Sequence, residues 1–207
     1  MPTGCQNQID LRPLQCIFGA MPIEKKATIL IKNIGQLITM KGPVPRVGRE
    51  MRDLGVIENG GIAAAGEEIL AVGPSEAVQG KVSLAEGCTV IDAEGAVVTP
   101  GLIDPHTHPV FARTREKEFE MRIEGKSYQE IARAGGGIRS SVRDLRESSQ
   151  VELTKNTHKR LDMLLSHGVT TIEGKSGYGL STESELKMLR VLRDLDNLHP
   201  MDIVPTF

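Results

Sequence analysis

The stretch that decides the fold reads Val97-Val98-Thr99-Pro100-Gly101-Leu102-Ile103-Asp104-Pro105-His106-Thr107-His108. Its nearly continuous Val, Leu and Ile run is typical of a strand buried on both faces, as in a parallel sheet. Side chains at i and i+2 of a strand point to one face, so His106 and His108 can converge on one ion. Such a position, at the carboxyl end of a strand, is where α/β barrels keep their chemistry. A pair of surface or core histidines is the alternative, which the preceding strand and the Pro-Gly and Asp-Pro pairs disfavour.

The composition is that of an ordinary soluble globular protein. A chain of 207 residues is long enough for one large domain or two small ones. Its 39% hydrophobic and 25% charged residues are typical values. The net charge of -2 gives no electrostatic basis for binding nucleic acid or an anionic membrane. We therefore expect neither as a partner.

The cysteines and the N-terminus predict a cytoplasmic protein. Cys5, Cys16 and Cys88 are widely separated and form no Cys-x-x-Cys pair, which disfavours a disulfide framework and a structural zinc site. No apolar run approaches the ~18 residues of a membrane span. The N-terminus has no basic start, and Asp10 and Arg12 interrupt what would be a signal core.

The first part of the chain is predicted to be a small β domain over residues 21–96. Residues 1–20 carry no clear period, and because Met21-Pro22 resembles a natural start we expect them to be a disordered extension or a misplaced start. Glycine and proline turn signals then separate short β segments. The predicted strands are Thr28–Ile31, Gln36–Thr39, Gly55–Ile57, Ile62–Ala65, Ile69–Val72 and Thr89–Asp92.

After His108 the pattern changes to alternating helices and strands. Ser127-x-x-Glu130 is a capping box that opens a helix over Tyr128–Ala134, and Gly135-Gly136-Gly137 ends this helix. The triplet lacks the pattern of a phosphate loop, so a plain loop is favoured over an anion cradle. A second capping box, Thr182-x-x-Glu185, opens another helix. The other predicted elements are a helix over Val151–His167 and strands over Val169–Lys175 and Asp202–Phe207.

The predicted fold class is α/β. Residues 97–207 correspond to the first three βα units of an incomplete (β/α)8 TIM-like barrel, a fold that takes ~250 residues. Because the sequence stops within a predicted strand, we expect the front portion of a longer protein.

Residues 99–108 resemble the first barrel strand of the amidohydrolase superfamily of metal-dependent hydrolases. The resemblance implies that His106 and His108 bind one divalent or trivalent metal ion, zinc or iron. A metal lowers the pKa of bound water from ~15.7 towards ~7 and polarises a carbonyl. The superfamily also implies that residues 21–96 are the N-terminal part of a β-sandwich. It implies a further His, an Asp and a general-base Glu on later strands, so no catalytic residue is expected within residues 1–207.

Other stretches resemble one family of this superfamily, the imidazolonepropionases. The resemblance implies hydrolysis of the cyclic amide of 4-imidazolone-5-propanoate to N-formimidoyl-L-glutamate, a step of histidine degradation. Gly174 is a departure, since the family more often has Val there, and we expect it to loosen strand packing. The matching stretches are Phe111–Glu118, Ser127-Tyr128, Ala134–Ile138, Lys175–Leu180, which is the most specific, and Glu185–Val191.

The same resemblance implies three substrate-binding residues. Arg115 offers a planar fork to the propanoate carboxylate, although its charged neighbours also suit a solvated face. Tyr178 lies between two glycines where its hydroxyl can point into a barrel mouth, with a turn-packing role as the alternative. Tyr128 matches more loosely, because the start of a helix also suits simple packing.

The remaining histidines and one lysine are not predicted to hold metal. His158, His167 and His199 have no ligand-like spacing and are expected to be structural or exposed. Lys175 suits a carboxylated-lysine bridge between two metals, but the resemblance implies a mononuclear site.

Two rival interpretations remain open. Another amidohydrolase acting on a cyclic amide, dihydroorotase-like or deaminase-like, is disfavoured by the Lys175–Leu180 block and the Arg115 loop. An inactive truncated remnant is favoured for the 207-residue chain by itself, because the later ligands are missing. The resemblance also leaves open a homodimer of the full-length protein.

Overall fold

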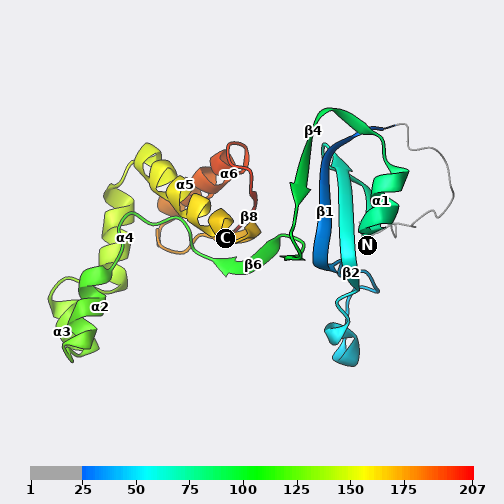
Figure 1. The fold of residues 1–207 in the computed structure, drawn as a ribbon. Coiled ribbons are helices and arrows are strands. Elements are labelled where there is room, and N and C mark those ends of the chain that lie inside the picture. The colour runs from blue at the N-terminus through cyan, green and yellow to red at the C-terminus, as the bar shows by residue number, and fades with distance from the viewer. Residues whose placement is uncertain (1–24) are drawn as a thin grey trace, which may run out of the picture. The chain divides into compact units, whose positions relative to one another are not determined.

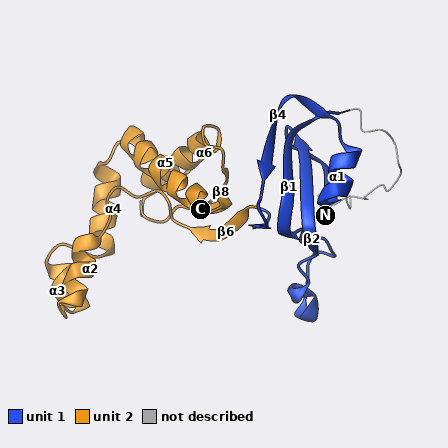
Figure 2. Ribbon diagram, in the orientation of Figure 1, with its two compact units in different colours: residues 1–100 blue, residues 101–207 orange. Residues whose placement is uncertain are grey.

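A computed structural model describes residues 25–207, so the prediction for residues 1–20 lies outside the described residues. The chain divides into two compact units, which meet between Pro100 and Gly101 (Figure 2). Within residues 25–207 no helix has the length and apolar character that crossing a membrane requires.

Within residues 25–100 the first unit forms a five-stranded sheet with one α-helix and a short 3-10 helix (Figure 1). The central strand β1 pairs antiparallel with β2 and parallel with β4 and β5, and β3 pairs with the other side of β2. The elements are β1 (Ala27–Ile38), η1 (Gly48–Arg52), β2 (Val56–Ala65), β3 (Glu68–Pro74), α1 (Ser75–Lys81), β4 (Leu84–Asp92) and β5 (Val97–Val98).

The predicted strands of this unit merge into fewer, longer ones. The glycines were expected to end strands, but Gly35 and Gly60 lie inside β1 and β2. At Gly35 a Cβ would lie 2.1 Å from the carbonyl oxygen of Gly95, so glycine there permits close backbone approach. The helix α1 was not predicted; its Val78 is buried in the same core as Leu30.

The apolar run at 97–108 was expected to form one strand, which is wrong. It is divided between β5, which pairs with β1, and β6 (Leu102–Thr107), which pairs with β7. Pro100 has no N–H to donate to a sheet, and a Cβ at Gly101 would lie 2.1 Å from Thr170 Oγ1. The chain therefore leaves one sheet and enters the next across Pro100-Gly101.

The second unit has a parallel three-stranded sheet in the order β6-β7-β8, with helices between the strands. This arrangement confirms the α/β class and the alternation of strands and helices, while closure into a barrel stays a prediction. The other elements are α2 (Glu116–Ile123), α3 (Tyr128–Arg133), α4 (Ile138–Glu147), α5 (Gln150–Ser166), β7 (Val169–Lys175), α6 (Thr182–Asp196) and β8 (Asp202–Thr206).

The core of this unit lies between the sheet and the helices α5 and α6, which contact each other and, respectively, β7 and β8 (Figure 1). Ile172 of β7 and Ile203 of β8 are register partners and both are buried. Leucines at helical spacing on α5 and α6 cover them. The buried leucines are Leu153, Leu161, Leu192 and Leu195.

Gly174 does not loosen this core, so that prediction is wrong. A Cβ at Gly174 would lie 2.8 Å from Cδ2 of Leu192 and 3.4 Å from Cγ2 of Ile203. Leu192 itself is fully buried. The leucine therefore fills the space that a larger residue on β7 would need.

Three short helices connect β6 to α5. The capping box at the start of α3 is confirmed, since the Ser127 hydroxyl accepts from Glu130 N–H and Glu130 accepts from Ser127 N–H. The helices α2 and α4 were not predicted. Gly137, with φ of +83°, is the N-cap of α4, so the glycine triplet links two helices.

Candidate active site

The two histidines of the His-x-His pair lie at the carboxyl end of β6. His106 is within the strand and His108 follows it. Their ring centroids are 5.7 Å apart in an edge-on arrangement. The strand is held to its neighbour by the Thr107 hydroxyl, which donates to the Glu173 carbonyl oxygen at 2.7 Å. The tip of a parallel strand thus places two imidazoles close together.

One ring nitrogen of His108 has no hydrogen-bond partner among residues 25–207. Its Nδ1 is buried and forms no hydrogen bond with any residue of the described part of the chain. A buried polar atom without a partner costs free energy, and neutral imidazole nitrogen is a common metal ligand. The donor set at the end of β6 therefore fits two ligands of a metal site.

Glu173 of the neighbouring strand β7 interacts electrostatically with His106 and forms hydrogen bonds with two other side chains. The Lys175 ammonium donates to Oε1 of Glu173 at 2.7 Å, and the Thr206 hydroxyl donates to the same atom at 3.1 Å. The Lys175 ammonium, the Thr206 hydroxyl and, more weakly, His106 lower the pKa of the Glu173 carboxyl below its ordinary value, against the effect of desolvation. Lys175 thus acts as a hydrogen-bonded ammonium here.

Tyr178 lies against the histidine pair. Its ring centroid is 5.2 Å from that of His108. Gly177 precedes it with φ of +119°, a conformation that favours glycine, and a Cβ there would approach Cε1 of His108 to 3.5 Å. The loop after β7 therefore approaches the imidazole closely and presents the tyrosine beside it.

Arg115 is the N-cap residue of α2 and forms an ion pair with Glu118. The hydrogen bond to Glu118 raises the pKa of the Arg115 guanidinium, and smaller contributions come from Tyr178 and Tyr128. Each of the two tyrosines is therefore within electrostatic reach of Arg115. The three residues come from separate segments of the chain, and their role in binding substrate stays a prediction.

Glu118 also reaches the glycine loop. Its Oε1 accepts the Gly137 N–H at 2.9 Å. Arg115 lowers the pKa of the Glu118 carboxyl most strongly, and the Gly137 N–H lowers it further, against desolvation. The Glu118 carboxylate thus orients Arg115 and binds the Gly137 N–H, which would otherwise be available to an anion.

Tyr128 is 65% exposed, and its hydroxyl lies 3.9 Å from where a Cβ of Gly137 would be.

Glu185 was predicted to complete a capping box with Thr182, which is wrong. The N-cap of α6 is Ser181, whose hydroxyl accepts from Ser184 N–H. The Glu185 carboxylate instead accepts N–H groups of the Gly177–Leu180 loop. Sequence reasoning therefore missed its role, although a glutamate shortly after a glycine-rich turn is a visible signal for such a bond.

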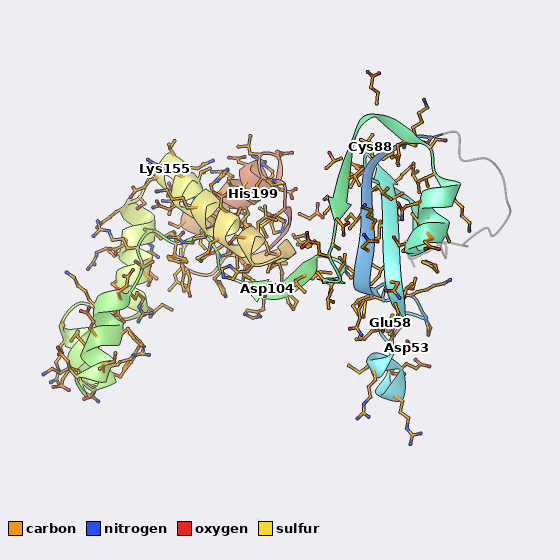
Figure 3. All side chains as sticks on the ribbon, viewed as in Figure 1. Asp53, Glu58, Cys88, Asp104, Lys155 and His199 are labelled. Atoms are coloured by element: carbon orange, nitrogen blue, oxygen red, sulfur yellow. The ribbon has the colours of Figure 1, made fainter. Side chains whose placement is uncertain are left out.

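A second group of possible metal ligands lies on the helical side of the unit. His158 Nδ1 is 3.1 Å from Oδ2 of Asp162, and His199 Nε2 is 3.3 Å from Oδ1; Figure 3 labels His199. The backbone N–H of Met201 donates to Nδ1 of His199, so the proton of the neutral ring is on Nε2 and faces Asp162. This geometry suits a hydrogen-bonded cluster better than a metal site. Spacing alone could have found only the i,i+4 pair.

The fold of the chain is similar to that of solved structures with the amidohydrolase fold. A solved adenosine deaminase from Xanthomonas campestris, whose structure has bound zinc, matches with a TM-score of 0.50 and 11% identity. The match covers 87% of this chain and 43% of that one. At this identity the likeness shows the fold alone. No family model matches the chain.

Sequence relatives specify the family. The chain is 48% identical over 180 residues to an imidazolonepropionase of Alkaliphilus metalliredigens and 48% identical over 183 residues to one of Geobacillus kaustophilus. Each match covers 86% of this chain, which spans about two-fifths of the relatives' length (42% and 43%). The chain is thus homologous to the N-terminal portion of the imidazolonepropionases, and the predicted resemblance is confirmed.

Proposed function

We propose that the full-length protein carrying this chain is an imidazolonepropionase, which hydrolyses the cyclic amide of 4-imidazolone-5-propanoate to N-formimidoyl-L-glutamate. The proposal is carried by the buried Nδ1 of His108, which has no hydrogen-bond partner in the described part of the chain and lies beside Tyr178. The chain that holds it is 48% identical to an imidazolonepropionase over 180 residues. A cytoplasmic location and a homodimer belong to the same proposal. Neither rests on the geometry of the site.

The chain contributes part of the metal site and part of the substrate site. His106 and His108 hold one zinc or iron ion, which supplies an activated water and polarises the amide carbonyl when bound. Arg115 binds the propanoate carboxylate through its planar guanidinium, which Glu118 holds in place. The hydroxyl of Tyr178 donates a hydrogen bond to the bound substrate ring. Tyr128 of α3 lines the same substrate site.

The test compares substrates with the full-length protein. We expect turnover of 4-imidazolone-5-propanoate, measured as loss of its ultraviolet absorbance, and no comparable turnover of dihydroorotate or of a hydantoin carrying the same propanoate. Turnover of another cyclic amide in its place would favour the rival amidohydrolase. The hydantoin controls for recognition of the carboxylate alone.

A further inference from the structure

We infer that Glu185 is the positioning residue that holds Tyr178 against the site, an inference that rests on the proposed function. Glu185 does not touch the predicted metal ligands. It acts through the loop between β7 and α6, whose amides converge on its carboxylate.

The carboxylate of Glu185 accepts hydrogen bonds from three backbone N–H groups of this loop. Oε2 of Glu185 accepts the Gly177 N–H at 2.6 Å, and Oε1 accepts the N–H groups of Gly179 and Leu180 at 2.8 and 2.7 Å. Glu185 is only 6% exposed, so these bonds are formed away from water. Hydrogen bonds to an ionised acceptor are roughly twice as strong as neutral ones.

The backbone of the loop needs this support. Gly177 and Leu180 have φ values of +119° and +49°, and the second is an uncommon conformation for a residue with a side chain. Gly179 packs so closely on the start of α6 that a Cβ would lie 2.6 Å from Cβ of Ser184. The loop therefore bends tightly around the carboxylate and has little room for other conformations.

A second side chain, that of Arg146, binds the carbonyl oxygens of the same loop. Arg146 of α4 donates from Nε to the Gly179 carbonyl at 2.7 Å and from Nη2 to the Leu180 carbonyl at 2.8 Å. Glu185 thus binds the amides and Arg146 the carbonyls. Tyr178 lies between the anchored residues 177 and 179, with its ring 5.2 Å from that of His108. Its position beside the imidazole follows from the two anchors.

The experiment uses Glu185→Gln in the full-length protein, with Glu183→Gln as the matched control. Glu183 is an exposed glutamate in the same first turn of α6. Glutamine keeps the size of the side chain but turns an NH₂ donor towards amides that are themselves donors. In hydrogen–deuterium exchange, the peptide covering residues 176–181 should exchange about tenfold faster or more in Glu185→Gln and remain unchanged in Glu183→Gln. Equal exchange in both variants would overturn the inference.

Kinetics then separate positioning from general loss of structure. Misplacing a substrate-binding group by about 1 Å can cost on the order of a hundredfold, so Glu185→Gln should lower kcat/KM by ten- to a hundredfold with metal content unchanged. In a Tyr178→Phe background the same substitution should have a clearly smaller effect, because the positioned hydroxyl is already absent. Fully additive losses would assign Glu185 a merely structural role. Absence of turnover in the unmodified protein would refute the proposed function instead. Hydrogen–deuterium exchange would still test whether Glu185 stabilises the loop over residues 176–181.

Discussion

At the scale of the residue, His106 and His108 carry the metal prediction. In the full-length protein, His106→Ala or His108→Ala should lose bound metal and activity together, because each removes an imidazole ligand from one strand end. His167→Ala, at an exposed histidine after α5, is the control and should keep both. Elemental analysis of the purified variants measures the outcome. Full metal content in both site variants would show that the metal does not bind at the end of this strand.

Arg115 is expected to recognise the propanoate. Loss of a charge-assisted contact costs about 1.5–3 kcal/mol, which is roughly ten- to a hundredfold in affinity. Arg115→Ala should therefore raise KM by about that factor and leave metal content unchanged. The control is Arg113→Ala, an exposed arginine two residues earlier. A normal KM in Arg115→Ala would contradict this prediction and favour the alternative, in which Arg115 belongs to a solvated charged surface.

At the scale of the element, the loop before α6 should respond to pH through Glu185. Burial raises the pKa of the Glu185 carboxyl, but the Leu180 N–H, the Ser176 hydroxyl and the N–H groups of Gly177 and Gly179 outweigh it, so the pKa lies below its ordinary value of 4.5. The ionised carboxylate therefore stabilises the folded protein at pH values above 4.5. That contribution is lost as pH falls through the lower folded-state pKa.

Urea unfolding of the full-length protein measures this pH dependence. The stability difference between the unmodified protein and Glu185→Gln should be constant between pH 6 and pH 8, and should shrink below about pH 4.5. Glu183→Gln should show no such trend. A difference that grows as pH falls would have the wrong sign for a carboxylate with a lowered pKa.

The contact of β7 with α6 gives a second prediction at this scale. Gly174→Val should destabilise the protein by about 1–3 kcal/mol, because a Cβ would lie 2.8 Å from the buried Leu192. The double variant Gly174→Val with Leu192→Ala should recover part of the loss, since the smaller residue makes room. Thermal unfolding of the three variants measures this. A stabilising Gly174→Val would restore the original expectation of loose packing.

At the scale of the whole molecule, the 207-residue polypeptide produced by itself should not turn over imidazolone propanoate. It supplies two imidazoles for a metal that usually takes four ligands, so the ion should bind weakly. The strand β8 pairs only with β7 among the described residues, and Val204 and Phe207 are exposed, which favours aggregation. Light scattering, metal analysis and a turnover assay test this. A soluble, active monomer with stoichiometric metal would contradict it.

The sequence by itself determined the features that depend on near neighbours in the chain. The alternation of helical and strand segments located α5, β7 and β8, and a capping box located α3. The His-x-His spacing placed His106 and His108 on one strand end, because side-chain direction in a strand has a period of two. Resemblance also selected Arg115, Tyr128 and Tyr178, and the fold brings each tyrosine within electrostatic reach of Arg115.

Only the tertiary structure decided the features that depend on distant partners. It joined the short β segments across glycines that admit a neighbouring backbone, and it filled the space at Gly174 with Leu192. It also turned Glu185 from an expected helix cap into the anchor of the loop that carries Tyr178. A carboxylate accepts hydrogen bonds from whichever donors the fold brings to it. The local sequence around Glu185 is therefore compatible both with a helix cap and with a loop anchor. Their difference lies in the packing of α6 against the strand end, which no local pattern encodes.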